Sequence, residues 1–238
     1  QSSNPKYAQF GGAASATYRK LSPTAGVKYQ LDDENQFYLG AGRTFRAPIN
    51  GALLQNFAAA ANSKNTANAA AGAYVNQPET ATTVDLGWRF YADRFSANID
   101  AYESHLKNKQ ISGYDNATGG TVYLSLPKMR MRGLTAEASY KMTADWTVYA
   151  NYSLQRATLQ GDVDTLGDGI YPTHGKSFLN TPKNSGYLRV AYSHGPLWAS
   201  LDAKYRGAVY GDWMNTDKVG GYTVFNLNAG VNLPDLSS

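Results

Sequence analysis

The acidic residues of one short segment are the first candidates for chemistry in this chain. Asp162, Asp164 and Asp168 lie close together, and their carboxylate oxygens are suitable ligands for a divalent cation. No Glu stands at the last ligand position of an EF-hand frame, so that calcium-binding motif is not met. A weakly held cation in this loop remains an alternative, but we predict no dedicated metal site.

Other reactive residue types are scarce. The chain contains no Cys, which excludes a disulfide framework, a thiolate metal site and a Cys nucleophile. It has no Gly-x-Ser-x-Gly sequence, no phosphate-binding glycine loop and no zinc motif. We find no catalytic constellation, and therefore predict that the chain is not an enzyme and has no cofactor.

The three histidines are scattered as His105, His174 and His194. His105 and His174 fall in segments on one side of the predicted fold, where they could act as axial ligands of a haem. The alternative, which we favour, is a surface or loop role for both. His194 lies in a short turn, and we expect it to be structural.

Charged residues occupy alternate positions in segments that are otherwise apolar. For example, Leu201, Ala203 and Tyr205 alternate with Asp202 and Lys204. This period of two is typical of a β-strand with one apolar face and one polar face. Because a charge facing lipid near the midplane costs about 2–4 kcal/mol, we expect such residues to line a hydrated lumen. The residues assigned to this lumenal set are Arg89, Asp100, Arg189, Asp202, Lys204 and Arg206.

The alternation extends over most of the chain and predicts about nine strands. Their ranges are 20–31, 36–46, 82–91, 95–109, 122–141, 146–159, 184–194, 197–210 and 221–232. Short turns at 32–35, 92–94, 143–145 and 194–196 alternate with long links at 48–80, 112–122, 160–183 and 211–220. In outer-membrane barrels the short turns are periplasmic and the long loops are extracellular. The strands also exceed the length of five or six residues that is usual in soluble sheets.

Composition agrees with this architecture. The chain has 18 Tyr among its 238 residues, a residue type suited to the bilayer interface. The net charge is +4, with dispersed basic residues, so we expect no nucleic-acid partner. The sequence contains no run of about 18 apolar residues, so we predict no transmembrane helix. We predict an all-β, transmembrane antiparallel β-barrel in the bacterial outer membrane.

Two features indicate that the chain is one segment of a larger barrel. An odd strand number cannot close into a single-chain bacterial barrel. The sequence also stops after a predicted strand, without the terminal aromatic residue that such barrels usually carry. Inside the longest link, the Ala/Asn-rich residues 58–73 predict either a helical turn or disorder.

Five local patterns, in order along the chain, resemble the C-terminal half of TonB-dependent receptors. Residues 42–48 read Gly-Arg-Thr-Phe-Arg-Ala-Pro and resemble the family's GxxFRAP strand end. The second pattern, Gln77-Pro78-Glu79-Thr80, retains only part of the family's NPxLKPE segment. The third, Arg132-Gly133-Leu134-Thr135-Ala136-Glu137, resembles RGxExE with Thr135 in place of the first acid. The last two are Asn180-Thr181-Pro182-Lys183 and Gly220-Gly221-Tyr222-Thr223-Val224.

This resemblance implies a 22-stranded barrel of which residues 1–238 are a partial barrel domain, at about strands 12 to 20. It also implies that the plug domain, the first half of the barrel and the last strands are absent. The implied partners are the plug domain of the same protein, the TonB–ExbB–ExbD complex, a siderophore or similar small ligand, and outer-membrane lipid with lipopolysaccharide. The implied function is import of a scarce ligand, most commonly a ferric siderophore, with energy transmitted by TonB.

In such a receptor the ligand contacts come from the long loops and the upper rim of the lumen. Aromatic faces together with an Arg suit an anionic iron chelate or a planar ligand. The residues predicted for this role are Arg46, Phe57, Tyr74, Tyr114, Tyr123, Tyr171, His174, Phe178 and Trp213. The competing interpretation is that these aromatic residues form the interfacial girdle or pack loops, and that Arg46 has a structural role at its strand end.

Three other functions stay open at this stage. A passive porin shares the alternation and the hairpin rhythm but not the five ordered patterns. Uptake of haem or of another TonB-dependent cargo is also compatible. A soluble β-rich surface protein or adhesin predicts shorter strands and solubility without detergent.

Overall fold

The computed structural model describes residues 17–48, 77–115, 120–164 and 169–233. All regular elements of these residues are β-strands. No helix within these ranges is long and apolar enough to cross a membrane. The Ala/Asn-rich residues 58–73 lie outside the described residues.

Nine strands form one antiparallel sheet in which each strand pairs with its neighbours along the chain once the loop strands are set aside. Their order is β1 (Thr24–Gln30), β2 (Asn35–Arg46), β3 (Glu79–Tyr91), β4 (Phe95–Lys107), β7 (Met129–Lys141), β8 (Trp146–Leu159), β11 (Asn184–His194), β12 (Leu197–Arg206) and β15 (Tyr222–Val231). Within the described residues β1 and β15 are the edges of this sheet. The predicted all-β antiparallel architecture is confirmed.

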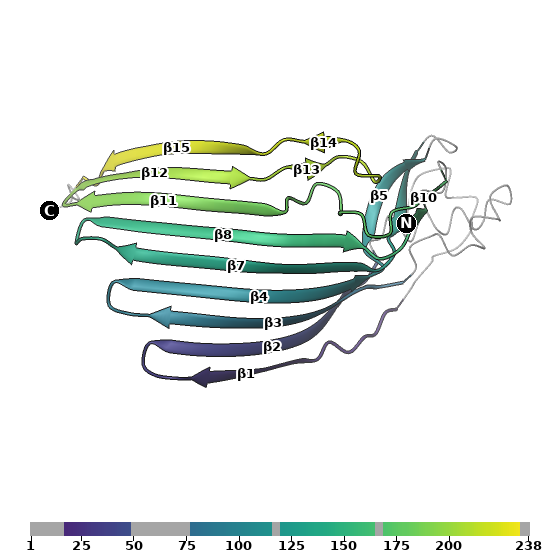
Figure 1. The fold of residues 1–238 in the computed structure, drawn as a ribbon, viewed down its shortest axis with the longest axis horizontal. Coiled ribbons are helices and arrows are strands. Elements are labelled where there is room, and N and C mark those ends of the chain that lie inside the picture. The colour runs from purple at the N-terminus through teal and green to yellow at the C-terminus, as the bar shows by residue number, and fades with distance from the viewer. Residues whose placement is uncertain (1–16, 49–76, 116–119, 165–168, 234–238) are drawn as a thin grey trace.

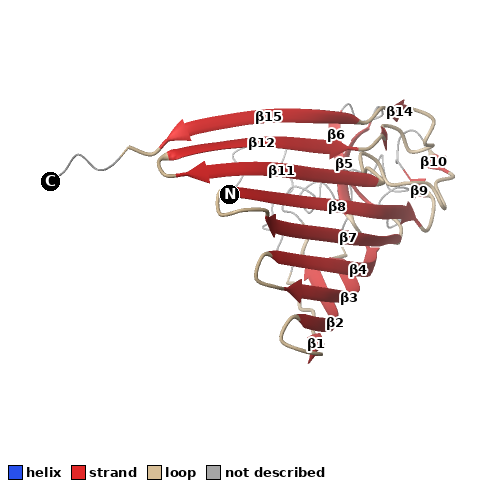
Figure 2. Ribbon diagram, turned by 60° about the vertical axis from the view of Figure 1, so that its left-hand side comes forward, coloured by secondary structure: helices blue, strands red, loops and turns tan. Residues whose placement is uncertain are grey.

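The remaining strands form three two-stranded hairpins in the long connections. They are β5 (Gln110–Asp115) with β6 (Gly120–Ser125), β9 (Val163–Asp164) with β10 (Ile170–Tyr171), and β13 (Val209–Tyr210) with β14 (Lys218–Val219). These hairpins gather at one end of the sheet, which we call the loop end (Figures 1 and 2). The opposite end carries the tight turns.

The tight turns are closed by local hydrogen bonds. In the turn between β1 and β2, Asp32 Oδ1 accepts hydrogen bonds from the backbone N–H of Glu34 at 2.9 Å and of Asn35 at 2.7 Å. The side-chain amide of Asn35 also donates to Asp32, and this bond is the main cause that lowers the pKa of Asp32. Such a turn fixes the register of the hairpin it closes.

The sheet has two chemically different faces. Ile99, Ala136, Tyr152 and Tyr205 belong to one row of cross-strand partners, together with Gly186. Trp88, Val148 and Leu201 lie on this same face, as the alternation predicts. The next row along the strands is polar and contains Asn98, Glu137, Asn151, Tyr187 and Lys204.

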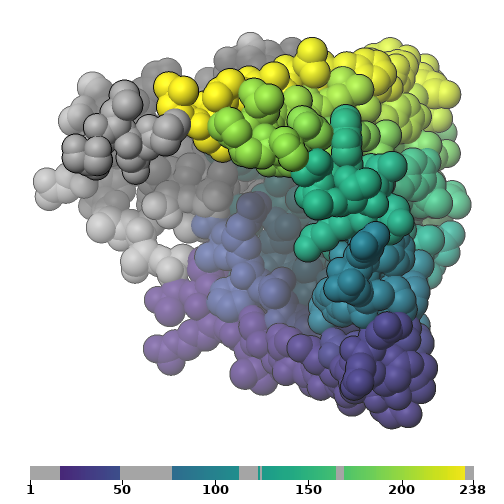
Figure 3. All heavy atoms as spheres, turned by 90° about the vertical axis from the view of Figure 1, so that its left-hand side faces the viewer, coloured from purple at the N-terminus to yellow at the C-terminus, as the bar shows by residue number. Residues whose placement is uncertain are grey.

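The apolar face is exposed to its surroundings rather than covered by another layer. Leu39, Leu86, Leu134, Leu188 and Leu227 are each more than 40% exposed. In water such a surface would be unfavourable over this many strands, whereas in a bilayer it is the surface that lipid covers. Viewed from the tight-turn end, the strands form a wall that curves from β1 to β15 (Figure 3).

Aromatic side chains form a chain on the apolar face near the tight turns. Phe90 and Phe95 have ring centroids 5.9 Å apart, and Phe95 lies 6.4 Å from Tyr140. Trp146 and Tyr192, on β8 and β11, are 4.9 Å apart. This position matches the aromatic girdle that outer-membrane barrels place at a membrane interface.

The structure corrects three sequence-based boundaries. The single strand predicted for 122–141 is divided into β6 and β7, because the chain turns at Leu126 and Pro127, where Leu126 is buried at the loop end. The link predicted for 112–122 instead contains most of the β5–β6 hairpin. The strand predicted for 197–210 ends at Arg206, and Val209 and Tyr210 belong to the separate strand β13.

Candidate functional site

The polar face of β2–β4 carries a network built around Tyr38. The hydroxyl of Tyr38 donates a hydrogen bond to Asp100 Oδ2 at 3.0 Å, and Asn98 Oδ1 lies 3.4 Å away. The guanidinium carbon of Arg89 lies 4.4 Å above the ring of Tyr38, and Arg89 also donates to Gln36 at 3.2 Å. Asp100 is thus held by the Tyr38 hydroxyl, and Arg89 is held by Gln36 and by a cation–π contact with the Tyr38 ring, all on the same face of the sheet.

A second network lies on β11, β12 and β15. Asp202 Oδ1 lies 3.6 Å from Arg189 Nε and accepts a hydrogen bond of 2.8 Å from the Tyr187 hydroxyl. The other oxygen of Asp202 accepts a bond of 3.4 Å from the side-chain amide of Asn228. Asp202 is buried, and these three partners offset the cost of removing its charge from water.

The register places all six residues of the predicted lumenal set on the polar face. Lys204 pairs with Tyr187 and is exposed, while Arg206 lies at the loop end of β12. Arg206 donates to the backbone oxygen of Asn180 at 3.0 Å and to its side-chain oxygen at 2.7 Å. Contact of these residues with a plug domain stays a prediction.

The polar face also holds an acidic depression that the sequence-based assignment left out. Its volume is about 470 Å³, and its acidic residues are Asp85, Asp100 and Glu137, with Tyr38 and Tyr102 beside them. Asp85 and Glu137 follow the same alternation as Asp100 and could have been assigned by it. Tyr38 and Tyr102 were not assigned to this face because tyrosine was expected at the bilayer interface and among the ligand contacts of the loops.

At the loop end, three long connections share one small hydrophobic core. Leu126, Leu159 and Val163 are buried there, and Phe178 and Trp213 pack against them. The rings of Phe178 and Trp213 have centroids 6.2 Å apart. Both aromatic residues therefore pack loops, as the competing interpretation holds, and their contact with a ligand stays a prediction.

Hydrogen bonds fasten the connection after β12 to the connection after β10. Asn215 Oδ1 accepts the backbone N–H of Ser177 at 2.7 Å, and Asn215 Nδ2 donates to the backbone oxygen of Ser177 at 3.1 Å. Asn215 has a φ of 59°, in the left-handed region that Asn tolerates better than most residues. These two hydrogen bonds between the Asn215 side chain and the Ser177 backbone join the two connections where no β-strand pairing does so.

Asp212 fixes the turn that presents Asn215. Its carboxylate accepts the backbone N–H of Asp217 at 2.7 Å and of Met214 at 3.1 Å, and the hydroxyl of Thr216 at 2.8 Å. Desolvation raises the pKa of Asp212, but these hydrogen bonds outweigh it and lower the pKa to about 2. Asp212 is consequently charged at neutral pH and organises its loop.

Arg46 pairs with a residue of another predicted pattern. Arg46 Nη2 lies 2.9 Å from Glu79 Oε2, and the two residues are cross-strand partners on β2 and β3. Lys109 lies 3.8 Å from the other oxygen of Glu79. The FRAP-like strand end and the Pro-Glu pair thus close the longest connection from both sides, which supports the structural alternative for Arg46.

The histidines occupy three separate places. His105 Nε2 lies 2.8 Å from Glu103 on the loop side of β4. His194 Nδ1 lies 3.1 Å from Asp145 and joins two tight turns, in agreement with a structural role. His174 is exposed, and its backbone N–H donates to Asp162 at 3.1 Å.

The remaining predicted contact residues are only partly placed. Tyr123, in β6, and Tyr171, in β10, are half-buried at the loop end. Tyr114 belongs to β5. Phe57 and Tyr74 lie outside the described residues, as does Asp168 of the acidic loop segment. Across the described residues no group of three His, Asp or Glu side chains is arranged to hold a metal ion.

Three solved structures with a similar fold are each much longer than this chain. The ferric citrate transporter FecA matches with a TM-score of 0.66 and 21% identity, over 90% of this chain and 31% of its own. The copper transporter OprC matches with a TM-score of 0.65 and 19% identity, over 90% and 31%. The ferric yersiniabactin uptake receptor FyuA from Yersinia pestis matches with a TM-score of 0.60 and 16% identity, over 87% and 29%. The chain thus spans about a third of the length of these structures.

The family model for the β-barrel of TonB-dependent receptor-like proteins matches residues 1–237. Barrels of this family reside in the bacterial outer membrane, in agreement with the two-faced sheet, its aromatic girdle and its alternation of tight turns with long loops. This chain belongs to the TonB-dependent receptor family and forms part of its β-barrel.

Proposed function

We propose that this chain is part of an active uptake receptor that binds a ferric siderophore at its extracellular loop end and imports it into the periplasm. One observation carries the proposal. The sheet is a wall with an apolar outer face and a polar inner face, and the charged residues of the inner face have hydrogen-bond or ion-pair partners on that same face. Such a wall can enclose a hydrated interior and a second domain, which a narrow packed barrel cannot.

The ligand would be captured at the loop end. There the β5–β6, β9–β10 and β13–β14 hairpins stand on a shared hydrophobic core, which fixes their positions before a ligand arrives. Preorganised loops lower the entropic cost of binding. Tyr123, Tyr171 and His174 are the described candidates for contact, and no cofactor is required beyond the iron chelate itself.

Transport would use a plug domain in the lumen and the TonB–ExbB–ExbD complex as the source of energy. The acidic depression with Asp85, Asp100 and Glu137, and the Arg189–Asp202 network, supply a charged wall for such a plug. The siderophore is the favoured cargo because two of the similar structures are a ferric citrate transporter and a ferric yersiniabactin uptake receptor.

Uptake of a radioactive iron chelate by iron-starved cells tests this function. Cells that produce the receptor should accumulate the chelate, and a protonophore or deletion of TonB should abolish the accumulation. Diffusion that persists without TonB would show a passive porin instead. If no ferric chelate were taken up but haem uptake depended on TonB, the cargo would be haem and not a siderophore.

A further inference from the structure

Three asparagines at the loop end share an uncommon backbone conformation. Asn108, Asn180 and Asn215 have φ values of 56°, 55° and 59°, and within the described ranges no other residue except glycine has a positive φ. This left-handed region is unfavourable for most side chains, and residues remain in it where the surrounding structure holds them. Each asparagine lies in a different long connection: Asn108 follows β4, Asn180 precedes β11, and Asn215 lies between β13 and β14.

The first asparagine fastens the connection after β4 to the end of the connection between β2 and β3. Asn108 Nδ2 donates a hydrogen bond to the backbone oxygen of Pro78 at 3.2 Å. The next residue, Lys109, extends its ammonium group to within 3.8 Å of the Glu79 carboxylate. These contacts join two connections that are separated by the whole of β3 and β4.

The other two asparagines join the connections after β8 and after β12. Asn180 donates its backbone N–H to the oxygen of Tyr210 at 3.0 Å, and its side-chain oxygen accepts a hydrogen bond from Arg206 at 2.7 Å. Asn215 bonds the backbone N–H and the backbone oxygen of Ser177 with its side chain. The two connections are thus fastened in both directions, each by an asparagine of its own.

Packing supplies the link between the connections after β4 and after β8. Leu126, from the first connection, is buried together with Leu159 and Val163 at the start of the second. The backbone N–H of Gln160 also donates to the oxygen of Lys128 at 2.7 Å. Contacts therefore run without interruption from the connection between β2 and β3 to the connection after β12.

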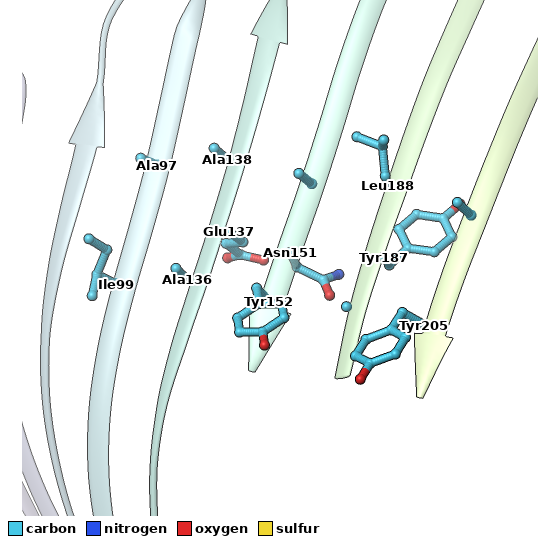
Figure 4. A pocket seen from close by; sticks show the side chains of 13 residues that line it. Ala97, Ile99, Ala136, Glu137, Ala138, Asn151, Tyr152, Tyr187, Leu188 and Tyr205 are labelled. Atoms are coloured by element: carbon cyan, nitrogen blue, oxygen red, sulfur yellow. The ribbon is translucent and has the colours of Figure 1, made fainter. Parts of the chain in front are cut away.

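Farther down the same strands no such side-chain fastening is needed. In the middle of the outward face Ala97, Ala136 and Ala138 present only small side chains (Figure 4). There the continuous backbone pairing of β4, β7 and β8 holds the strands together. At the loop end these strands have finished, so the connections depend on side chains to keep their relative positions.

We infer that Asn108, Asn180 and Asn215 are positioning residues that join the connections after β4, β8 and β12 into one rigid rim, which captures cargo without closing over it connection by connection. The rim holds Tyr123 and Tyr171 in place before cargo arrives, so less conformational entropy is lost on binding. The role in capture rests on the proposed function, whereas the rigidity of the rim does not.

Double electron–electron resonance between two spin labels tests the rim without any cargo. Labels at Ser112→Cys on β5 and Lys218→Cys on β14, both exposed positions, should give one narrow distance distribution in the full receptor in lipid vesicles. The variant Asn108→Gly/Asn180→Gly/Asn215→Gly still allows the left-handed backbone but lacks the side-chain bonds. Its distribution should be about twofold broader, because the connections can then move separately.

Two single variants separate the loss of these bonds from the flexibility of glycine. Asn180→Asp retains an acceptor for Arg206 and should keep the narrow distribution, whereas Arg206→Ala removes the donor, leaves residue 180 unchanged and should produce part of the broadening. Labels at Asp33→Cys and Ala144→Cys, at the tight-turn end, should report the same narrow distance in every variant and so verify that the barrel is intact.

A broad or split distribution in the unchanged receptor would overturn the inference, as would a distribution that the triple asparagine variant leaves unaltered. Because the sample holds no cargo, either result would be independent of whether the receptor carries a ferric siderophore. Failure of every ferric chelate in the uptake assay would, in turn, contradict the proposed function and leave the rigid rim standing.

Discussion

Asp212 and Asn215 show how single side chains hold the loop end in place. Asp212 gathers two backbone N–H groups and one hydroxyl, which leaves Asn215 free to bond both backbone groups of Ser177. A neutral side chain at position 212 offers weaker acceptors. The charge on this carboxylate is therefore part of the loop structure.

The depressed pKa of Asp212 predicts a defined pH window. An aspartate with a folded pKa of about 2 and an ordinary value of 3.8 contributes stability that is complete above 3.8 and is lost as the pH falls toward 2. We expect the contact of Trp213 with Phe178 to persist at pH 5 and to disappear between about pH 4 and pH 2. Fluorine NMR of the receptor labelled at Trp213 would follow it.

Two variants make that measurement specific. Asp212→Asn should weaken the Trp213 contact already at neutral pH and should remove the acid transition. Asp217→Asn, in the same loop, should retain the transition, because Asp217 contributes its backbone N–H and not its carboxylate. An identical acid transition in Asp212→Asn would contradict the assigned role.

For single residues, the sequence correctly predicted the face of the sheet wherever that face follows from regular alternation along a strand. Arg89, Asp100, Arg189 and Asp202 lie on the face expected of them, because a period of two assigns a face without any knowledge of the fold. Asp212 and Asn215 could not be found in this way. Their role depends on Ser177, which lies in a different connection.

The strands of the main sheet could be predicted for a related reason. Each strand is stabilised mainly by its two neighbours along the chain, so the hairpin rhythm determines the topology. The prediction failed at 122–141, where Pro127 and the burial of Leu126 in the loop core interrupt an apparently continuous strand. The hairpins of the loop end depend on contacts between different connections, and local sequence patterns do not predict such contacts.

The two faces of β7 can be tested with adjacent substitutions. Ala138→Arg places a charge on the outward face in the middle of the apolar band and should destabilise the receptor by about 2–4 kcal/mol. Ser139→Arg places the same side chain on the polar face, in the row of Tyr149, and should cost much less. Urea unfolding of the refolded receptor in lipid vesicles gives both values. Equal losses of stability for the two variants would be inconsistent with the assigned faces.

Across the part of the chain that the structure describes, the main sheet has no central core like that of a soluble domain. In the described residues the buried apolar side chains concentrate at the loop end, while the large apolar residues of the sheet lie exposed on its outer face. A soluble sandwich would bury that face against a second sheet. The distribution is that of a wall with lipid on one side and a hydrated interior on the other.

Spin-label accessibility in lipid vesicles tests this distribution most directly. The chain has no cysteine, so Cys substitutions within it can be labelled one at a time. Labels at Val148 and Leu201 should be relaxed by lipid-soluble oxygen, and labels at Asn151 and Lys204 by a water-soluble nickel chelate. If Val148 and Leu201 were instead reached by the nickel chelate, or if all four positions were shielded from both reagents, the account of this chain as an outer-membrane receptor wall would be contradicted.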